Sequence, residues 1–189
     1  TPPMITCPAN ISVNNDLGLC SAVVSFVATA TGTPTPTITY SQNPGTAFPV
    51  GTTTVTATAT NSCTPGSASC SFTVTVNDAE APLITAGSIA ACYPSAAAAE
   101  AAALAATGAS DNCTAATLLG KTASTSGDCS ATVTVTVTDE CGNSASTSYS
   151  TRVDGTPPVV TAGSIAACYP TAAAAEAAAL AATGASDNC

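Results

Sequence analysis

The sequence contains no histidine and no tryptophan, and its 189 residues include only three phenylalanines and two basic side chains, Lys121 and Arg152. Without histidine, a serine or threonine nucleophile lacks its usual general base. The G-x-S-x-G motif that exposes a nucleophilic serine at a sharp turn is also missing. We therefore expect no enzymatic activity from this segment.

Positive charge is scarce, because two basic residues stand against eleven acidic ones and the formal net charge is −9. Nucleic acids and anionic membranes need their phosphates neutralised by cations, so neither is an expected partner. No apolar run approaches the roughly 20 residues of a membrane span. The alanine-rich stretches are interrupted by Glu100 and Glu176 and closed by Gly108 and Gly184. Membrane insertion is therefore not expected.

Cysteine, in contrast, is abundant, with ten residues. Zinc binding is disfavoured because histidine is absent and no C-x2-C pair occurs, so disulfides formed in an extracellular compartment are the preferred interpretation. Among three possible connectivities for each group of four, we predict the pairs Cys7–Cys20, Cys63–Cys70, Cys113–Cys141 and Cys92–Cys129.

Residues 85–113 return at 161–189, with Ser95 replaced by Thr171 as the single change. This shift of 76 residues marks a tandem repeat and suggests a segment of a longer array. We predict three domains, at 1–79, 80–155 and 156–189, the last being a truncated copy of the second. On this interpretation the disulfide partners of Cys168 and Cys189 lie outside the chain.

Strand signals dominate. Threonines alternate with apolar residues over 54–60 (T-V-T-A-T-A-T), 71–76 (S-F-T-V-T-V) and 131–138 (A-T-V-T-V-T-V-T), as expected of half-buried β-strands. Further strands are expected at 11–13, 22–28, 37–40 and 145–153, and the segment 54–60 belongs to a strand expected at 52–60. Several short strands separated by turns predict a mainly β fold built from tandem immunoglobulin-like sandwiches.

The repeated stretch carries the one helical signal. Ser95, or Thr171 in the second copy, can cap a run of good helix formers that ends at Gly108 or Gly184. Alanine favours a helix over 95–107, inserted into the second type of sandwich. A disordered linker is the alternative, but a helix this short needs packing, which we expect through Leu104 and the methyl groups around it.

Four segments of the first domain occur in a characteristic order: T-P-P-M-I-T-C-P-A-N-I-S-V, D-L-G-L-C-S-A-V-V, F-P-V-G-T-T-T-V and C-S-F-T-V-T-V-N-D. In this order, residues 1–79 resemble a hyalin repeat (HYR) domain. The resemblance implies an immunoglobulin-like extracellular module with a role in adhesion or scaffolding. Residues 32–36 stand where the family usually has D-N-C, and Cys63 is additional.

The later segments D-N-C (111–113), D-E-C-G-N (139–143) and D-G-T-P-P (154–158) resemble the repeats of very large cell-surface adhesins or filaments of Bacteroidota. This resemblance implies a structural or adhesive function, with neighbouring repeats, and other copies in a filament, as partners. The alternative is an accessory module of a secreted protein that binds surface glycans or proteins.

Acidic residues gather where one domain passes into the next and in nearby loops. Carboxylate oxygens are preferred ligands of calcium, so a calcium site at the domain junctions is one hypothesis. Plain solvated acids are the alternative, since no contiguous D-x-D-x-D run occurs, and no other cofactor is expected. The candidate ligands are Asp78, Glu80, Asp111, Asp139 and Asp154.

Overall fold

The structure is a computed structural model that describes all 189 residues, and it is mainly β with two helices. The chain divides into two compact units. The first unit comprises Thr1–Ile84, Ala109–Gly120 and Val137–Ala145, and the second comprises Thr85–Gly108, Lys121–Thr136 and Ser146–Cys189. Two loops that follow the predicted first domain in sequence therefore belong to the first unit.

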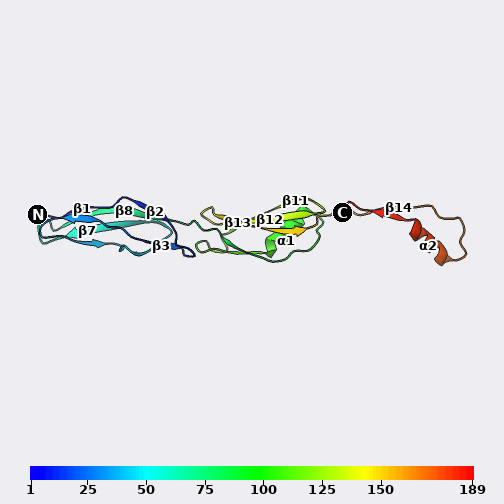
Figure 1. Cartoon of the computed structure of the whole chain (residues 1–189), viewed down its shortest axis with the longest axis horizontal. Helices are drawn as coiled ribbons and strands as arrows, with labels where there is room; N and C mark the ends of the chain where they lie inside the picture. The colour runs from blue at the N-terminus through cyan, green and yellow to red at the C-terminus, as the bar shows by residue number, and fades with distance from the viewer. The chain divides into compact units, whose positions relative to one another are not determined.

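The first eight strands form the body of the first unit (blue to cyan in Figure 1). They are β1 Met4–Thr6, β2 Ile11–Asn14, β3 Ser21–Val24, β4 Thr29–Thr31, β5 Thr37–Tyr40, β6 Thr46–Pro49, β7 Gly51–Thr60 and β8 Ser67–Asn77. The main sheet has the order β2-β8-β7-β5, and β1 pairs with β4 and β3 with β6. Within the main sheet, β2 runs parallel to β8 and the other neighbours are antiparallel.

The alternating sequences of β7 and β8 place their apolar residues on one face. Phe72, Val74 and Val76 are buried there, as predicted, and Val55 lies opposite Phe72 in the register. Phe26 packs edge-on against Phe72, with ring centroids 4.9 Å apart. All three phenylalanines of the chain lie in this core, where each buried ring contributes about 1.5–3 kcal/mol.

The remaining elements are seven strands and the two helices. They are β9 Leu83–Ala86, α1 Ala96–Ala106, β10 Thr107–Ser110, β11 Gly120–Ser126, β12 Ala131–Thr138, β13 Ser144–Thr151, β14 Val159–Thr161, α2 Ala172–Ala182 and β15 Gly184–Ser186. Strands β11, β12 and β13 form a three-stranded sheet, and β9–β10 and β14–β15 form pairs. The 85–113 stretch and its copy thus have the same order of elements.

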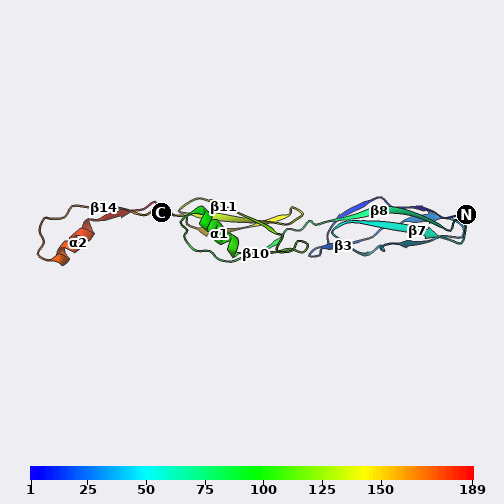
Figure 2. The ribbon, with the colours of Figure 1, turned by 180° about the vertical axis from the view of Figure 1, so that it is seen from behind.

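Helix α1 begins as its sequence indicates, because the Ser95 hydroxyl accepts a hydrogen bond from the Ala98 N–H (3.2 Å). Its face packs onto the sheet (Figure 2), with Ala99 and Ala103 fully buried in a cluster that includes Tyr149. The predicted contact through Leu104 is secondary, since that side chain is only partly buried.

The C-terminal end of α1 differs from the prediction, which placed the stop at Gly108. Thr107 caps the helix through its N–H, and its buried hydroxyl lies 2.7 Å from both the Ala103 carbonyl and the Tyr149 hydroxyl. Gly108 instead lies in β10. A threonine that bonds back to the carbonyl four residues earlier can end a helix without glycine.

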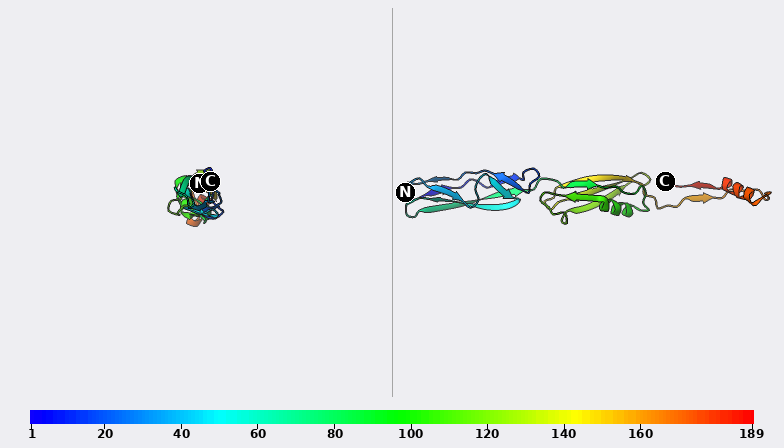
Figure 3. Two further views of the ribbon diagram at one scale, coloured as in Figure 1. Left: turned by 90° about the vertical axis from the view of Figure 1, so that its left-hand side faces the viewer. Right: turned by 90° about the horizontal axis from the view of Figure 1, so that it is seen from below.

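Helix α2 repeats this capping (orange to red in Figure 3), with the Thr171 hydroxyl accepting from the Ala174 N–H at 3.1 Å. Unlike α1, it has no buried residue. Neither helix is long and apolar enough to cross a membrane.

Candidate functional site

The first disulfide joins Cys7 to Cys70, with their Cα atoms 5.9 Å apart. Strand β2 runs parallel to β8 with Ile11 opposite Val74, and the cysteines lie four residues earlier on each side, so the same register brings them together. The predicted pairs Cys7–Cys20 and Cys63–Cys70 are therefore wrong. They assumed that β8 begins after Cys70, whereas it begins at Ser67.

The second disulfide joins Cys20 to Cys113, which are 93 residues apart in sequence. It connects the D-L-G-L-C turn before β3 with the D-N-C loop after β10, and it lies within the first unit. The predicted pair Cys113–Cys141 is wrong, because it assumed that the D-N-C loop would be bridged within its own domain.

The third disulfide joins Cys129 to Cys189 within the second unit. The predicted pair Cys92–Cys129 and the predicted external partner for Cys189 are therefore both wrong. Cys189 is the copy of Cys113 at the 76-residue period, so both D-N-C cysteines bond to a cysteine that precedes their own repeated stretch. The cysteines that remain as free thiols are Cys63, Cys92, Cys141 and Cys168.

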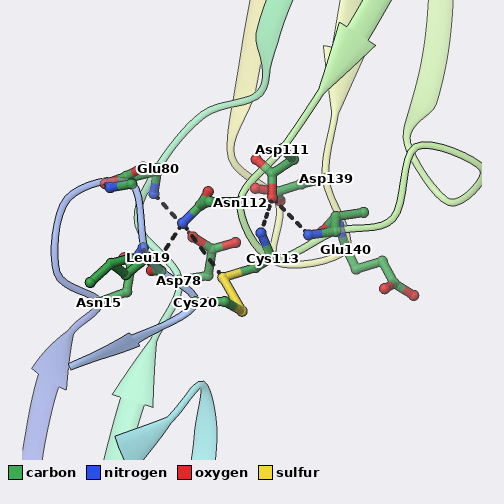
Figure 4. Close-up of a disulfide and its surroundings, with 12 residues drawn as sticks. Asn15, Leu19, Cys20, Asp78, Glu80, Asp111, Asn112, Cys113, Asp139 and Glu140 are labelled. Carbon is green, nitrogen blue, oxygen red and sulfur yellow. Dashed lines mark hydrogen bonds between the residues drawn. A yellow bond between two sulfur atoms is a disulfide. The ribbon is translucent and has the colours of Figure 1, made fainter. Parts of the chain in front are cut away.

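Hydrogen bonds support the Cys20–Cys113 bridge on both sides (Figure 4). The Asn112 side chain donates to the Leu19 carbonyl at 3.1 Å. Gly18, which has a φ of 72° that other residues rarely adopt, donates its N–H to the Glu80 carboxylate at 2.7 Å. The turn before Cys20 is therefore held both by the D-N-C loop and by the segment after β8.

Three acidic residues each follow a strand directly: Asp78 after β8, Asp111 after β10 and Asp139 after β12. In each, one carboxylate oxygen accepts the backbone N–H two residues later, from Glu80, Cys113 and Cys141 respectively. Such Asx turns reverse the chain at a strand end. They also fix the orientation of each carboxylate, because one of its oxygens accepts the backbone hydrogen bond and the other takes no part in the turn.

The three carboxylates converge. One ligand atom from each of Asp78, Asp111 and Asp139 lies within 4.8 Å of the other two. Asp78 and Asp139 are only 7% exposed, and the Oδ2 atoms of Asp78 and Asp111 are buried without a hydrogen-bond partner. Figure 4 shows the group beside the Cys20–Cys113 disulfide. We call these three residues the acid cluster.

Electrostatics within the acid cluster are unfavourable for three negative charges. Burial raises the pKa of Asp78 above its usual value, the Glu80 N–H partly offsets the rise, and the charges of Asp111 and Asp139 add to it. The pKa of the nearby Cys141 thiol is also raised, by partial desolvation and by the carboxylates. That thiol therefore stays protonated and is a poor metal ligand.

Two of the five predicted calcium ligands lie outside the cluster. The Glu80 carboxylate accepts from Gly18, and the Asp154 carboxylate accepts from the Thr156 N–H at 3.1 Å. Asp154 is the copy of Asp78 at the 76-residue period, and its Asx turn is the same. Of the five predicted ligands, the structure brings together the three in the first unit.

Hollows on the first unit reach both sides of the acid cluster. One of about 300 Å³ is lined in part by Glu80 and Asp111, and one of about 320 Å³ in part by Asp78 and Cys141. Two residues of the acid cluster thus border solvent-filled hollows.

Comparison with known families gives one match. Residues 1–76 match the HYR domain family. The HYR domain is an extracellular repeat module, and the three disulfides agree with that environment. The match ends within β8, so Cys113 and all three members of the acid cluster lie beyond the matched residues. No curated protein matches the chain.

Proposed function

We propose that this segment is a structural and adhesive part of a long extracellular or cell-surface repeat protein, built from tandem immunoglobulin-like modules. The observation that carries the proposal is the Cys20–Cys113 disulfide, which ties the HYR segment to the repeat that follows it. The second copy of the D-N-C loop makes an equivalent bond through Cys189. Neighbouring repeats are the partners in this function, and no catalytic role is included.

Covalent bonds between successive repeats suit a protein that transmits force along its length. When the ends of the chain are pulled, the tension follows the shortest covalent path. The Cys20–Cys113 bond lets that path bypass 93 residues, including the whole core of the first unit. Those residues are then shielded from extension even if the fold opens.

Single-molecule force spectroscopy tests this design. In the variant C20S/C113S the remaining Cys7–Cys70 bond bypasses only 63 residues. The covalent path therefore lengthens by 30 residues, which is the difference between the sequence separations of the two disulfides, 93 and 63. At 3.3–3.6 Å per residue we expect about 10 nm of additional contour length. The matched variant C7S/C70S should extend no further than the unmodified chain, because the shortest path does not use that bond.

Equal extension of both variants would contradict the proposal, and it would do so whether or not the variants fold, because contour length depends only on covalent connectivity.

The alternative function, recognition of glycans or proteins, predicts saturable binding of the chain on a glycan array. Most of the aromatic side chains that could stack on sugars are buried, namely Phe26, Phe48, Phe72 and Tyr149. This burial favours the structural function.

A further inference from the structure

We propose that Asp78, Asp111 and Asp139 form a calcium site that joins the end of the HYR segment to two loops of the following repeat. The proposal is independent of the force-bearing role above, because it rests on the chemistry of the acid cluster alone. All three residues belong to the first unit, so the site lies within one compact body.

Two buried carboxylate oxygens of the acid cluster lack a hydrogen-bond partner. Asp78 is 93% buried, since its exposed fraction is 7%, and its Oδ2 atom has no hydrogen-bond partner. Asp111 Oδ2 is unpartnered as well. Buried polar atoms are rarely left without a partner, and a buried unpaired carboxylate is costlier still. A cation bound by the acid cluster would satisfy both atoms.

The negative charge of the acid cluster needs a neutralising partner. The chain has only two basic side chains, and the Lys121 ammonium group donates to the Thr107 carbonyl in the second unit. Asn143 donates to Asp139 and to the Asp78 carbonyl, but an amide carries no charge. Three carboxylates therefore need a metal ion or bound protons.

The type and spacing of the ligand atoms favour calcium. All candidate ligand atoms are carboxylate oxygens, which suit hard cations such as calcium and magnesium. Oxygens on opposite sides of a calcium ion are about 5 Å apart, because each Ca–O distance is 2.3–2.6 Å, and the cluster's oxygens lie within 4.8 Å of one another. Magnesium requires a tighter and more regular shell. Water can complete the calcium shell from the adjoining hollows.

The loops are already shaped for this purpose. The engaged Oδ1 atoms hold the three Asx turns, so the carboxylates need not reorganise when an ion binds. Thr114, which is buried, accepts from the Glu140 N–H and ties the two loops of the second repeat together. A bound ion would add a link between these loops and the end of β8.

The test is a calcium titration of the full chain. Isothermal titration calorimetry should show one calcium bound with a Kd of roughly 0.1–1 mM, the range of extracellular modules. The unfolding temperature of the first unit should rise by several degrees between EDTA and 10 mM calcium, and rise less with magnesium. Absence of calcium binding, or an equal response to magnesium, would overturn the assignment.

The variant D111N removes charge but keeps an oxygen that can accept from the Cys113 N–H. It should abolish the calcium response. The matched variant is D187N, at the copy of Asp111, where the carboxylate accepts from the Cys189 N–H in the same way. It should leave the response intact, and equal behaviour of the two variants would refute the site.

The variant D78N distinguishes an ion site from a merely structural turn. In EDTA it should unfold at a higher temperature than the unmodified chain, because one of three repelling charges is gone. In calcium it should unfold at a lower temperature, because a ligand is gone. A variant that is less stable under both conditions would count against the proposal.

Discussion

The same eleven-residue helix, AAAAEAAALAA, occurs twice in this molecule in two different environments. In α1, Ala99 and Ala103 are fully buried against the sheet that contains β12 and β13. In α2, no residue is buried and Leu180 is 77% exposed. The strands that cover α1 follow it in sequence.

The comparison separates local from tertiary contributions. Both helices begin at a hydroxyl cap and end at a threonine, so alanine propensity and capping alone define their bounds. Only α1 gains burial, and its contact surface consists mainly of methyl groups. Because alanines leave little space between helix and sheet, a substitution there should act very differently from the same substitution in α2.

The largest contrast is expected from a charge at the packed face. A103D buries an uncompensated carboxylate, which costs about 3–5 kcal/mol. A179D, its counterpart in α2, should cost about 1 kcal/mol or less, from helix propensity. Native-state hydrogen exchange followed by mass spectrometry measures both, through peptides of α1, β12 and α2. Similar losses in the two variants would mean that α1 is not packed as described.

The contrast also shows how far the sequence could predict this fold. Strands β7, β8 and β12 followed from their alternation, and α1 followed from alanine and Ser95. Strands β1, β4 and β6 were missed, because three or four residues carry little periodic signal. The Thr107 cap was missed because the prediction placed the stop at the next residue, Gly108, and the bond of Thr107 to Tyr149, 42 residues away, is a tertiary contact.

Disulfide pairing could not be predicted because it depends on strand register. In the first domain the nearest cysteines were paired on the assumption of local closure, whereas a parallel strand pair brings Cys7 to Cys70. A signal was present: Cys7 precedes Ile11 as Cys70 precedes Val74, with the same spacing. For the acid cluster, the residue type was predicted and three of five residues converge, but the choice among them required the loops in place.

A second prediction concerns the buried hydroxyl pair. T107V keeps the shape of the side chain but leaves the Tyr149 hydroxyl without its 2.7 Å partner in a buried position. We expect a loss of about 1–3 kcal/mol in the free energy of opening of α1. T183V removes an exposed hydroxyl that bonds only to the Ala179 carbonyl. Its effect should be a few tenths of a kcal/mol, and a larger effect would show that α2 has a tertiary partner.

Removal of the N-cap costs both helices a similar amount and should give the smallest difference between them. S95A and T171A each delete one hydrogen bond to the third residue of the helix and cost about 1 kcal/mol. Because α1 is held by the sheet, S95A should leave its amides protected at a reduced level. A short helix without packing is only marginally stable, so T171A should shift α2 measurably towards unfolded backbone. Hydrogen exchange of the amides of 98–106 and 174–182 distinguishes the two responses. Equal loss of protection would mean that the buried alanines contribute nothing to helix formation.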